Sequence, residues 1–350
     1  MTLFTRFGAR RVMITSVVAA ASVALVLSGC SGGGTTPAAT TGASEAPESS
    51  VDPFAPEVDT VKAVQYKQTS AAPWFAAITA GYPEEYGINL TTDYGENSPA
   101  ILTSLVGGSG DVGTVSAPSI IDAVNSGIDI VIVGEAFRDP PQSQMLEALP
   151  GSGIKSMKDL DGKTVGVVGL NSGQHNRLRY VMKQAGLDPE GPTFVNLTYG
   201  EMAANLENGT IDAGAFTGAV LKQARDKLKT VDVFDFGDGP LKEISSLQWV
   251  STGAFAKANP NAIAAFQCAV VYKGEKLVMD DEDAYTNAMV NDVGFDPAAV
   301  KAITKVIYPA ANDPKVMQLN AKIQYQVGLT PEEFDMAKVT IPLPTNCDKK

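Results

Sequence analysis

The segment GIKSMKDLDGKTVGVVG, residues 153–169, does more to decide the fold than any other stretch of the sequence. Its second half, residues 163–169, is short, rich in valine and closed by glycine, as expected of a buried strand. Asn171, Ser172 and Gly173 follow, and they lead into an apolar pattern of helical period that ends near Ala185. The segment therefore predicts a strand, a loop and a helix in that order.

The same order of elements recurs on both sides of this segment. Before it, apolar runs predict strands at residues 61–66, 88–94, 111–115 and 128–133. After it, strands are expected at residues 193–197 and 211–216, and the chain becomes mostly helical beyond Trp249. Strands separated by helices indicate an α/β fold with mainly parallel sheets.

Two stretches of the chain look like versions of one unit. LTTDYGE at residues 90–96 precedes a predicted helix and then GDVG at 110–113. LTYGE at residues 197–201 likewise precedes a predicted helix and then IDAG at 211–214. Coincidence is the alternative, because glycine and aspartate are common in turns. The shared order of elements favours two similar lobes.

Composition excludes several classes of protein. The 350 residues are 44% hydrophobic with a formal net charge of -12, which argues for a globular body and against nucleic-acid binding. The sequence has a single histidine, His175, and three widely separated cysteines, so it lacks histidines and cysteines at the spacing typical of a metal site. Neither a Gly-x-Ser-x-Gly motif nor a phosphate-binding loop is present. We therefore expect no catalytic residues, no metal and no cofactor.

The N-terminus has the pattern of an export signal. Three arginines precede an apolar run at residues 12–27, which ends in LSGC at residues 27–30. This predicts a signal peptide at residues 1–29 and a lipid-modified Cys30 that anchors the protein to the outer face of the membrane. A chance cysteine after an ordinary cleavage site is the alternative. Residues 30–59 are rich in Gly, Thr, Pro and Ser and predict a flexible linker.

The two other cysteines predict a disulfide. Cys268 falls in a predicted helix and Cys347 in a proline-rich tail. Disulfides form outside the cytoplasm, so a Cys268–Cys347 bond would fasten the tail to the body. Two unpaired thiols are the alternative.

Three loops are candidates for ligand binding. Gly95–Ser98, Ser116–Ser119 and Asn171–Gln174 each open a predicted helix at the carboxyl end of a strand, where open α/β sheets bind ligands. Plain helix capping is the alternative for each loop. Glu135 would select a cationic ligand if it lay in a cleft. Arg138 and Arg177 could neutralise an anion, but as isolated residues they are expected at the surface. Aromatic side chains in corresponding loops are Trp74, Phe137, Tyr199 and Trp249.

The sequence resembles the substrate-binding lipoproteins of ABC importers, in the superfamily that handles nitrate, alkanesulfonates, taurine and thiamine-pyrimidine precursors. The matching segments lie within residues 61–329 and are YGINL at 86–90, the helix and GDVG at 100–113, the run at 153–167, and NGTIDA at 208–213. The resemblance implies a two-lobed periplasmic-binding-protein-like fold of type II with two hinge crossings. One lobe would comprise residues 60–144 plus 251–344 and the other residues 145–250, with a tail at 345–350.

The resemblance also implies a ligand cleft between the lobes. By position, the expected ligand-binding residues are Thr69, Trp74, Asn97, Ser98, Ser116, Ala117, Glu135, Phe137, Asn171, Ser172, Gly173, Tyr199, Thr217 and Trp249. The implied function is capture of a small organic molecule, sulfonate-like, taurine-like, aromatic or pyrimidine-like, by a monomer that delivers it to the permease and ATPase of an ABC importer. Two alternatives remain open. One is an enzyme like those of thiamine-pyrimidine biosynthesis, and the other is a ligand-sensing lipoprotein without a transport role.

Overall fold

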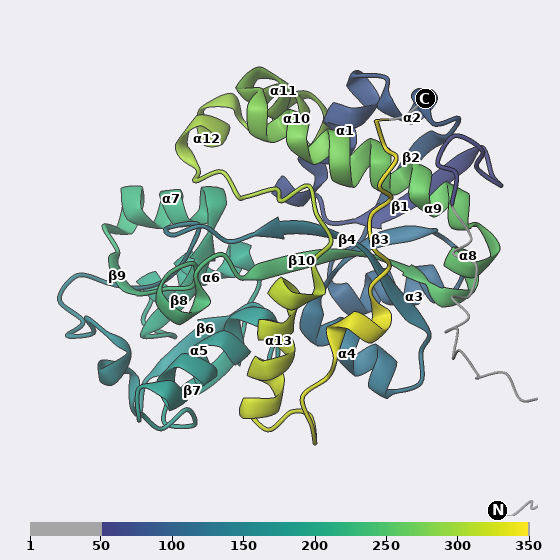
Figure 1. Ribbon diagram of the computed structural model, residues 1–350. Helices are drawn as coiled ribbons and strands as arrows, with labels where there is room; N and C mark the ends of the chain where they lie inside the picture. Colours follow the sequence, from purple (N-terminus) through teal and green to yellow (C-terminus); the bar gives the residue numbers. More distant parts are fainter. Residues whose placement is uncertain (1–50, 349–350) are drawn as a thin grey trace, which may run out of the picture. The chain divides into compact units, whose positions relative to one another are not determined.

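The computed structural model describes residues 51–348, and these build two mixed sheets (Figure 1). The first sheet has the strand order β2-β1-β3-β10-β4 and the second has the order β7-β6-β8-β5-β9. The expected signal peptide, Cys30 and the first part of the expected linker lie outside the described residues. The strands of the first sheet are β1 (Thr60–Gln65), β2 (Asn89–Tyr94), β3 (Val112–Ser116), β4 (Ile130–Arg138) and β10 (Ser245–Thr252). The strands of the second sheet are β5 (Gln144–Ala148), β6 (Thr164–Val167), β7 (Thr193–Asn196), β8 (Ala213–Thr217) and β9 (Val231–Asp235).

Two crossings connect the sheets. Residues 139–143 lead from β4 to β5, and residues 236–244 lead from β9 back to β10. Strand β10 runs antiparallel to β3 and β4, and β5 runs antiparallel to β8 and β9. The expectation of mainly parallel sheets is therefore wrong, because each strand that arrives from the other lobe runs against its neighbours. All of β10 pairs within the first sheet, so residues 245–250 join this sheet rather than the second lobe.

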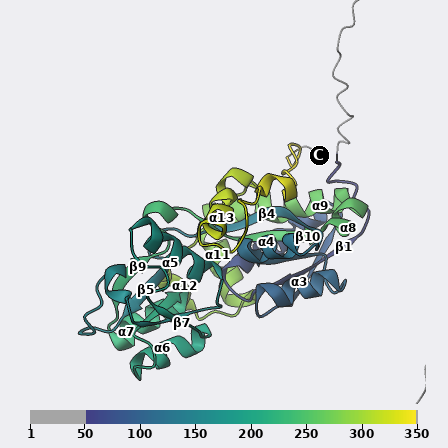
Figure 2. The ribbon, with the colours of Figure 1, turned by 90° about the horizontal axis from the view of Figure 1, so that it is seen from below.

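Helices cover both sheets (Figures 1 and 2). Helix α13 contacts both α4 and α5, so it spans elements attached to different sheets. Within residues 51–348, no helix combines the length and the apolar character needed to cross a membrane. The α-helices are α1 (Ala72–Thr79), α2 (Tyr82–Glu85), α3 (Ser98–Val106), α4 (Ala117–Asn125), α5 (Gly173–Gln184), α6 (Tyr199–Glu207), α7 (Gly218–Leu228), α8 (Gly253–Ala258), α9 (Pro260–Phe266), α10 (Glu275–Asp280), α11 (Glu282–Asn287), α12 (Pro297–Ala302) and α13 (Pro314–Gln326). Short 3-10 turns at Thr69–Ala71, Met157–Leu160, Gly239–Leu241 and Met336–Val339, and π-helical segments at Gln267–Gly274 and Ala288–Asp292, complete the helical structure.

The largest hydrophobic cluster lies between the first sheet and the helices around α1 and α9. Trp74 and Trp249 are fully buried there, with their rings stacked 5.8 Å apart, and Phe266 packs against both. Cys268 and Cys347 belong to the same cluster and are joined by a disulfide that closes a loop of 79 residues. The C-terminal tail is thereby covalently attached to the core of the first lobe.

Candidate functional site

Five helices begin where strands of the two sheets end. Helices α3 and α4 follow β2 and β3 in the first lobe, and α5, α6 and α7 follow β6, β7 and β8 in the second. Within each lobe these strands run parallel, so their carboxyl ends, and the helix N-termini after them, meet at one edge of the sheet. Helix N-termini offer backbone N–H groups and a partial positive charge to a ligand.

In the first lobe, hydroxyl groups at the carboxyl edge of the sheet are linked by hydrogen bonds. The Tyr66 hydroxyl lies 2.9 Å from Ser98 Oγ, and Ser98 Oγ lies 3.3 Å from Ser116 Oγ. The Ser116 backbone N–H donates to Ser98 Oγ at 3.0 Å, and the Ser116 hydroxyl lies 3.3 Å from that of Ser119. Burial raises the pKa of Tyr66, while its hydrogen bond to Ser98 opposes this shift. Tyr66 was missed from the sequence, although its place directly after β1 at the carboxyl edge was a usable signal.

In the second lobe, the polar side chains of Ser172 and Tyr199 lie at the starts of α5 and α6. Ser172 precedes α5 but makes no capping hydrogen bond, and its Oγ is buried without a partner among the described residues. The Tyr199 hydroxyl accepts a hydrogen bond from Gln174 Nε2 at 3.1 Å. Burial raises the pKa of Tyr199, and the nearby Asp139 carboxylate and Tyr66 phenol raise it further.

Arg177 joins the second lobe to both crossings. Its side chain is 4% exposed and forms an ion pair of 2.7 Å with Asp139 in the first crossing. Its NH2 group also donates to the Ser245 carbonyl at 3.3 Å and to Ser246 Oγ at 3.1 Å, where the second crossing enters β10. The expectation of a surface position for Arg177 is therefore wrong. Its Nε is buried without a partner among the described residues.

Glu135 is paired inside the protein. Its side chain is fully buried, and Arg138 donates to its two oxygens from Nε and NH2, both at 2.8 Å. Arg138 itself is mostly buried, contrary to the expected surface position. Because this pairing balances the charge of Glu135, the carboxylate is not free to select a cationic ligand.

Three of the four expected aromatic platforms lie in the core instead. Trp74 and Trp249 stack on each other, as described above, and Phe137 belongs to the same cluster with 6% exposure. These rings hold the first sheet to its helices, which is a sufficient reason for aromatic residues at these positions. Tyr199 is the one expected aromatic residue outside this cluster, and its hydroxyl is hydrogen-bonded to Gln174.

The remaining expected residues have mainly local roles in the described contacts. Asn97 is exposed and caps α3, because its Oδ1 accepts the Ala100 N–H at 2.9 Å. The Thr69 carbonyl accepts the Tyr308 hydroxyl at 2.6 Å, and the Thr217 hydroxyl donates to the Ser143 carbonyl at 3.0 Å. Ala117 is the buried first residue of α4.

The loop before α5 is shaped by its own contacts. Asn171 is exposed with φ 60°, and its backbone N–H donates to His175 Nδ1 at 2.8 Å. Burial, helped by the charge of Arg179, lowers the pKa of His175 to about 4. A Cβ at Gly173 would lie 3.9 Å from the Arg177 guanidinium, which is an ordinary van der Waals contact, so the position of Arg177 does not require a glycine here.

The chemistry of this region is that of hydrogen bonding. Hydrogen bonds connect Ser98, Ser116 and Tyr66 in the first lobe, and Gln174 with Tyr199 in the second. The contacts of the serine hydroxyls described above are to other hydroxyls and backbone groups, not to a base that would activate them. Within residues 51–348, no three His, Cys, Asp or Glu side chains are grouped to hold a metal ion. Hydroxyls, amides and helix N-termini can orient a small polar molecule.

Comparison with known proteins adds both sequence and structural relatives. A family model described as "NMT1/THI5 like" matches residues 68–285. The 4-amino-5-hydroxymethyl-2-methylpyrimidine phosphate synthase of Schizosaccharomyces pombe is 32% identical over 143 residues, which are 41% of this chain and 40% of that protein. The chain thus matches about two fifths of the length of this curated relative.

Solved structures of binding proteins share the fold. The alkanesulfonate-binding protein SsuA from Xanthomonas axonopodis pv. citri, bound to MOPS, has a TM-score of 0.67 at 20% identity, covering 82% of this chain and 99% of that one. The aliphatic sulphonate-binding SsuA from Escherichia coli has a TM-score of 0.68 at 20% identity, covering 84% and 100%. The nitrate-binding NrtA from Synechocystis PCC 6803 has a TM-score of 0.66 at 15% identity, covering 82% and 87%. Together with the sheet topology and the family match over residues 68–285, these similarities show that the chain belongs to the NMT1/THI5-like family and has the two-lobed type II fold of periplasmic binding proteins.

Proposed function

We propose that this protein is an extracytoplasmic solute-binding lipoprotein that captures a small organic molecule and delivers it to the permease and ATPase of an ABC importer. The observation that carries the proposal is a set of hydroxyl groups at the carboxyl edges of both sheets: Tyr66, Ser98 and Ser116 are hydrogen-bonded in the first lobe, and Tyr199 bonds to Gln174 in the second. Polar groups at the edges of both lobes suit a ligand that is enclosed when the lobes approach. The binding proteins that share the fold support the same class of function.

Two buried polar atoms that lack a hydrogen-bond partner also point to a ligand. Ser172 Oγ and Arg177 Nε are buried without a partner among the described residues. Buried polar groups are normally hydrogen-bonded, because an unmade bond costs about 1–3 kcal/mol. A ligand that accepts from Arg177 Nε and bonds to Ser172 would satisfy both groups.

The charge balance favours a neutral or zwitterionic ligand over a simple anion. Arg177 is paired with Asp139, and Arg138 is paired with Glu135, so each of these buried charges has a partner inside the protein. A sulfonate or nitrate would have to bind beside the Asp139 carboxylate without a free cation from either pair. A pyrimidine-like ring with its own donors and acceptors fits the hydroxyls and the two phenols better. The name of the S. pombe relative, which contains a methylpyrimidine, agrees with this choice.

Membrane attachment is part of the proposal and rests on the sequence. The LSGC motif at residues 27–30 would place the lipid on Cys30. Metabolic labelling with a palmitate analogue tests this point. Wild-type protein should be labelled, whereas Cys30→Ala should not, and equal labelling of both would contradict the anchor.

Titration calorimetry with matched variants tests the binding site. The full-length protein is titrated with a methylated aminopyrimidine, taurine, an alkanesulfonate and nitrate. Ser172→Ala and Tyr199→Phe should each weaken binding by about tenfold, the equivalent of one lost hydrogen bond. Asn97→Ser is the control, because it keeps a capping side chain on an exposed residue. Unchanged affinity in both site variants would contradict this placement of the ligand.

An enzyme remains the second candidate because the S. pombe relative is named as a synthase. A binding protein must return its ligand unchanged, whereas a synthase must convert it. Mass spectrometry after prolonged incubation with the bound molecule separates the two functions. Recovery of intact ligand supports transport, and appearance of a new product supports the enzyme.

A further inference from the structure

The first described residues of the N-terminal linker are bound to the surface of the first lobe. The Asp52 N–H donates to Asn261 Oδ1 at 2.8 Å, and Asn261 Nδ2 donates to the Ala55 carbonyl at 3.0 Å. The two oxygens of Glu57 accept the N–H groups of Asn261 and Ala262 at 3.0 and 2.9 Å. Residues 52–57 were expected to belong to a flexible linker, so these contacts need an explanation.

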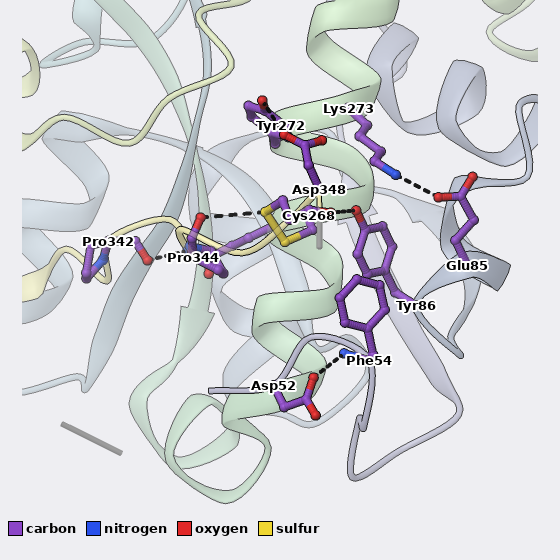
Figure 3. Close-up of a disulfide and its surroundings, with 12 residues drawn as sticks. Asp52, Phe54, Glu85, Tyr86, Cys268, Tyr272, Lys273, Pro342, Pro344 and Asp348 are labelled. Atoms are coloured by element: carbon purple, nitrogen blue, oxygen red, sulfur yellow. Dashed lines mark hydrogen bonds and ion pairs between the residues drawn. A yellow bond between two sulfur atoms is a disulfide. The ribbon is translucent and has the colours of Figure 1, made fainter. Parts of the chain in front are cut away.

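Tyr86 connects this segment to the C-terminal tail (Figure 3). The rings of Phe54 and Tyr86 stack with centroids 5.0 Å apart, and the Tyr86 hydroxyl donates to the Cys347 carbonyl at 2.6 Å. Tyr86 is fully buried, and Lys273 lies 5.0 Å from its ring centroid while pairing with Glu85 at 2.6 Å. The Tyr86 ring is therefore held from several sides, and Phe54 packs against it.

The disulfide fixes the position of the group that Tyr86 binds. Cys347 lies near the end of the chain, and its bond to the buried Cys268 holds its carbonyl beside Tyr86. Without this bond, the tail near Cys347 would have only non-covalent contacts to keep it there. One of these is the hydrogen bond of 3.0 Å from the Tyr272 hydroxyl to Asp348. The linker, Tyr86 and the disulfide thus form a continuous series of contacts.

We propose that Tyr86, Asn261 and Ala262, supported by the disulfide-linked tail, form a linker seat that fastens the N-terminal linker to the first lobe. Resting on the proposed function, this means that the membrane anchor holds the first lobe while the second lobe is free to move during ligand capture. With Cys30 as the anchor, the free tether ends at residue 52 instead of 59. This shortens its maximum reach by roughly 24 Å, at about 3.4 Å per residue.

Hydrogen exchange of the full-length protein, followed by mass spectrometry, tests the linker seat. The readout is the exchange rate of a peptide covering residues 51–58, which requires neither ligand, lipid nor permease. Failure of the seat and failure of the proposed function are therefore distinguishable. Cys347→Ser should accelerate exchange in this peptide by about tenfold, because the tail loses its covalent attachment.

Two tyrosine variants provide a matched comparison in which the disulfide remains intact. Tyr86→Phe keeps the ring that stacks on Phe54 but loses the bond to Cys347, and should accelerate exchange about threefold. Tyr272→Phe removes a different bond to the tail and should leave the linker peptide unchanged. If Cys347→Ser also accelerates exchange in the core peptide 245–252, its effect is a general loss of stability. The comparison of Tyr86→Phe with Tyr272→Phe then tests the linker seat. Wild-type exchange in Tyr86→Phe, or equal acceleration in both tyrosine variants, would overturn the proposal.

Discussion

Breaking the Arg177–Asp139 ion pair should destabilise the protein by an amount that depends on the partner left behind. Both side chains are at most 4% exposed, and their charged atoms lie 2.7 Å apart. Removing one member of such a pair leaves an uncompensated buried charge and costs about 3–5 kcal/mol. Asp139→Asn keeps the shape of the side chain but leaves Arg177 with neutral acceptors, the Ser245 carbonyl and Ser246 Oγ. Arg177→Met leaves the Asp139 carboxylate buried.

The double variant distinguishes coupling from two separate effects. Asp139→Asn with Arg177→Met contains neither buried charge, so it should lose less stability than the sum of the single losses. We expect a coupling energy of about 2–3 kcal/mol from urea unfolding at pH 7. The exposed pair Lys222–Asp226, also 2.7 Å apart, is the matched control and should show no measurable coupling. Additive losses at Arg177 and Asp139 would show that these two charges do not balance each other in the hinge.

Three further outcomes follow from buried groups of the described chain. Replacing Cys268 and Cys347 by serine should cost about 4.5 kcal/mol in urea unfolding, from the entropy of a 79-residue loop; a loss near zero would contradict this. Burial raises the pKa of Glu275 well above 4.5; the Ala310 N–H and Arg138 oppose this shift, and Glu135 adds to it. The folded protein therefore keeps this carboxyl protonated where the unfolded chain ionises it, so its contribution to stability falls as pH rises above 4.5. Glu275→Gln should therefore gain stability relative to wild type as pH rises, and parallel pH profiles would contradict a neutral buried acid. His175, the only histidine, should titrate near pH 4 by NMR, since burial favours its neutral ring and its contribution to stability is lost as pH falls from 6.5 toward 4; a midpoint near 6.5 would contradict its burial.

The alternation of strands and helices was readable from sequence because local patterns carry it. The valine-rich run around Val165 and the polar start of α5 both have short-range signals, and the structure has a strand and a helix there. The direction of β5 and β10 was not readable, because it depends on which distant strands they pair with. No local pattern reveals that the chain crosses between the sheets twice.

The candidate site was only partly predictable for a related reason. Ser98 and Ser116 precede or begin helices after strands, so topology alone brings them together. Trp74 lies in the first turn of α1 and Trp249 lies within β10, and the rings of both turn into the core, because side-chain direction is decided by packing. Arg177 was expected at the surface because its partner, Asp139, lies 38 residues away in a crossing that the sequence does not mark.

Calorimetric titration of the full-length protein with a neutral aminopyrimidine and with an alkanesulfonate measures directly which class of ligand the protein binds. We expect saturable binding of the neutral ring, weakened by Tyr199→Phe, and much weaker binding of the anion, because the buried cations are already paired. Tight sulfonate binding, unaffected by Ser172→Ala and Tyr199→Phe, would contradict both the ligand class and the placement of the site.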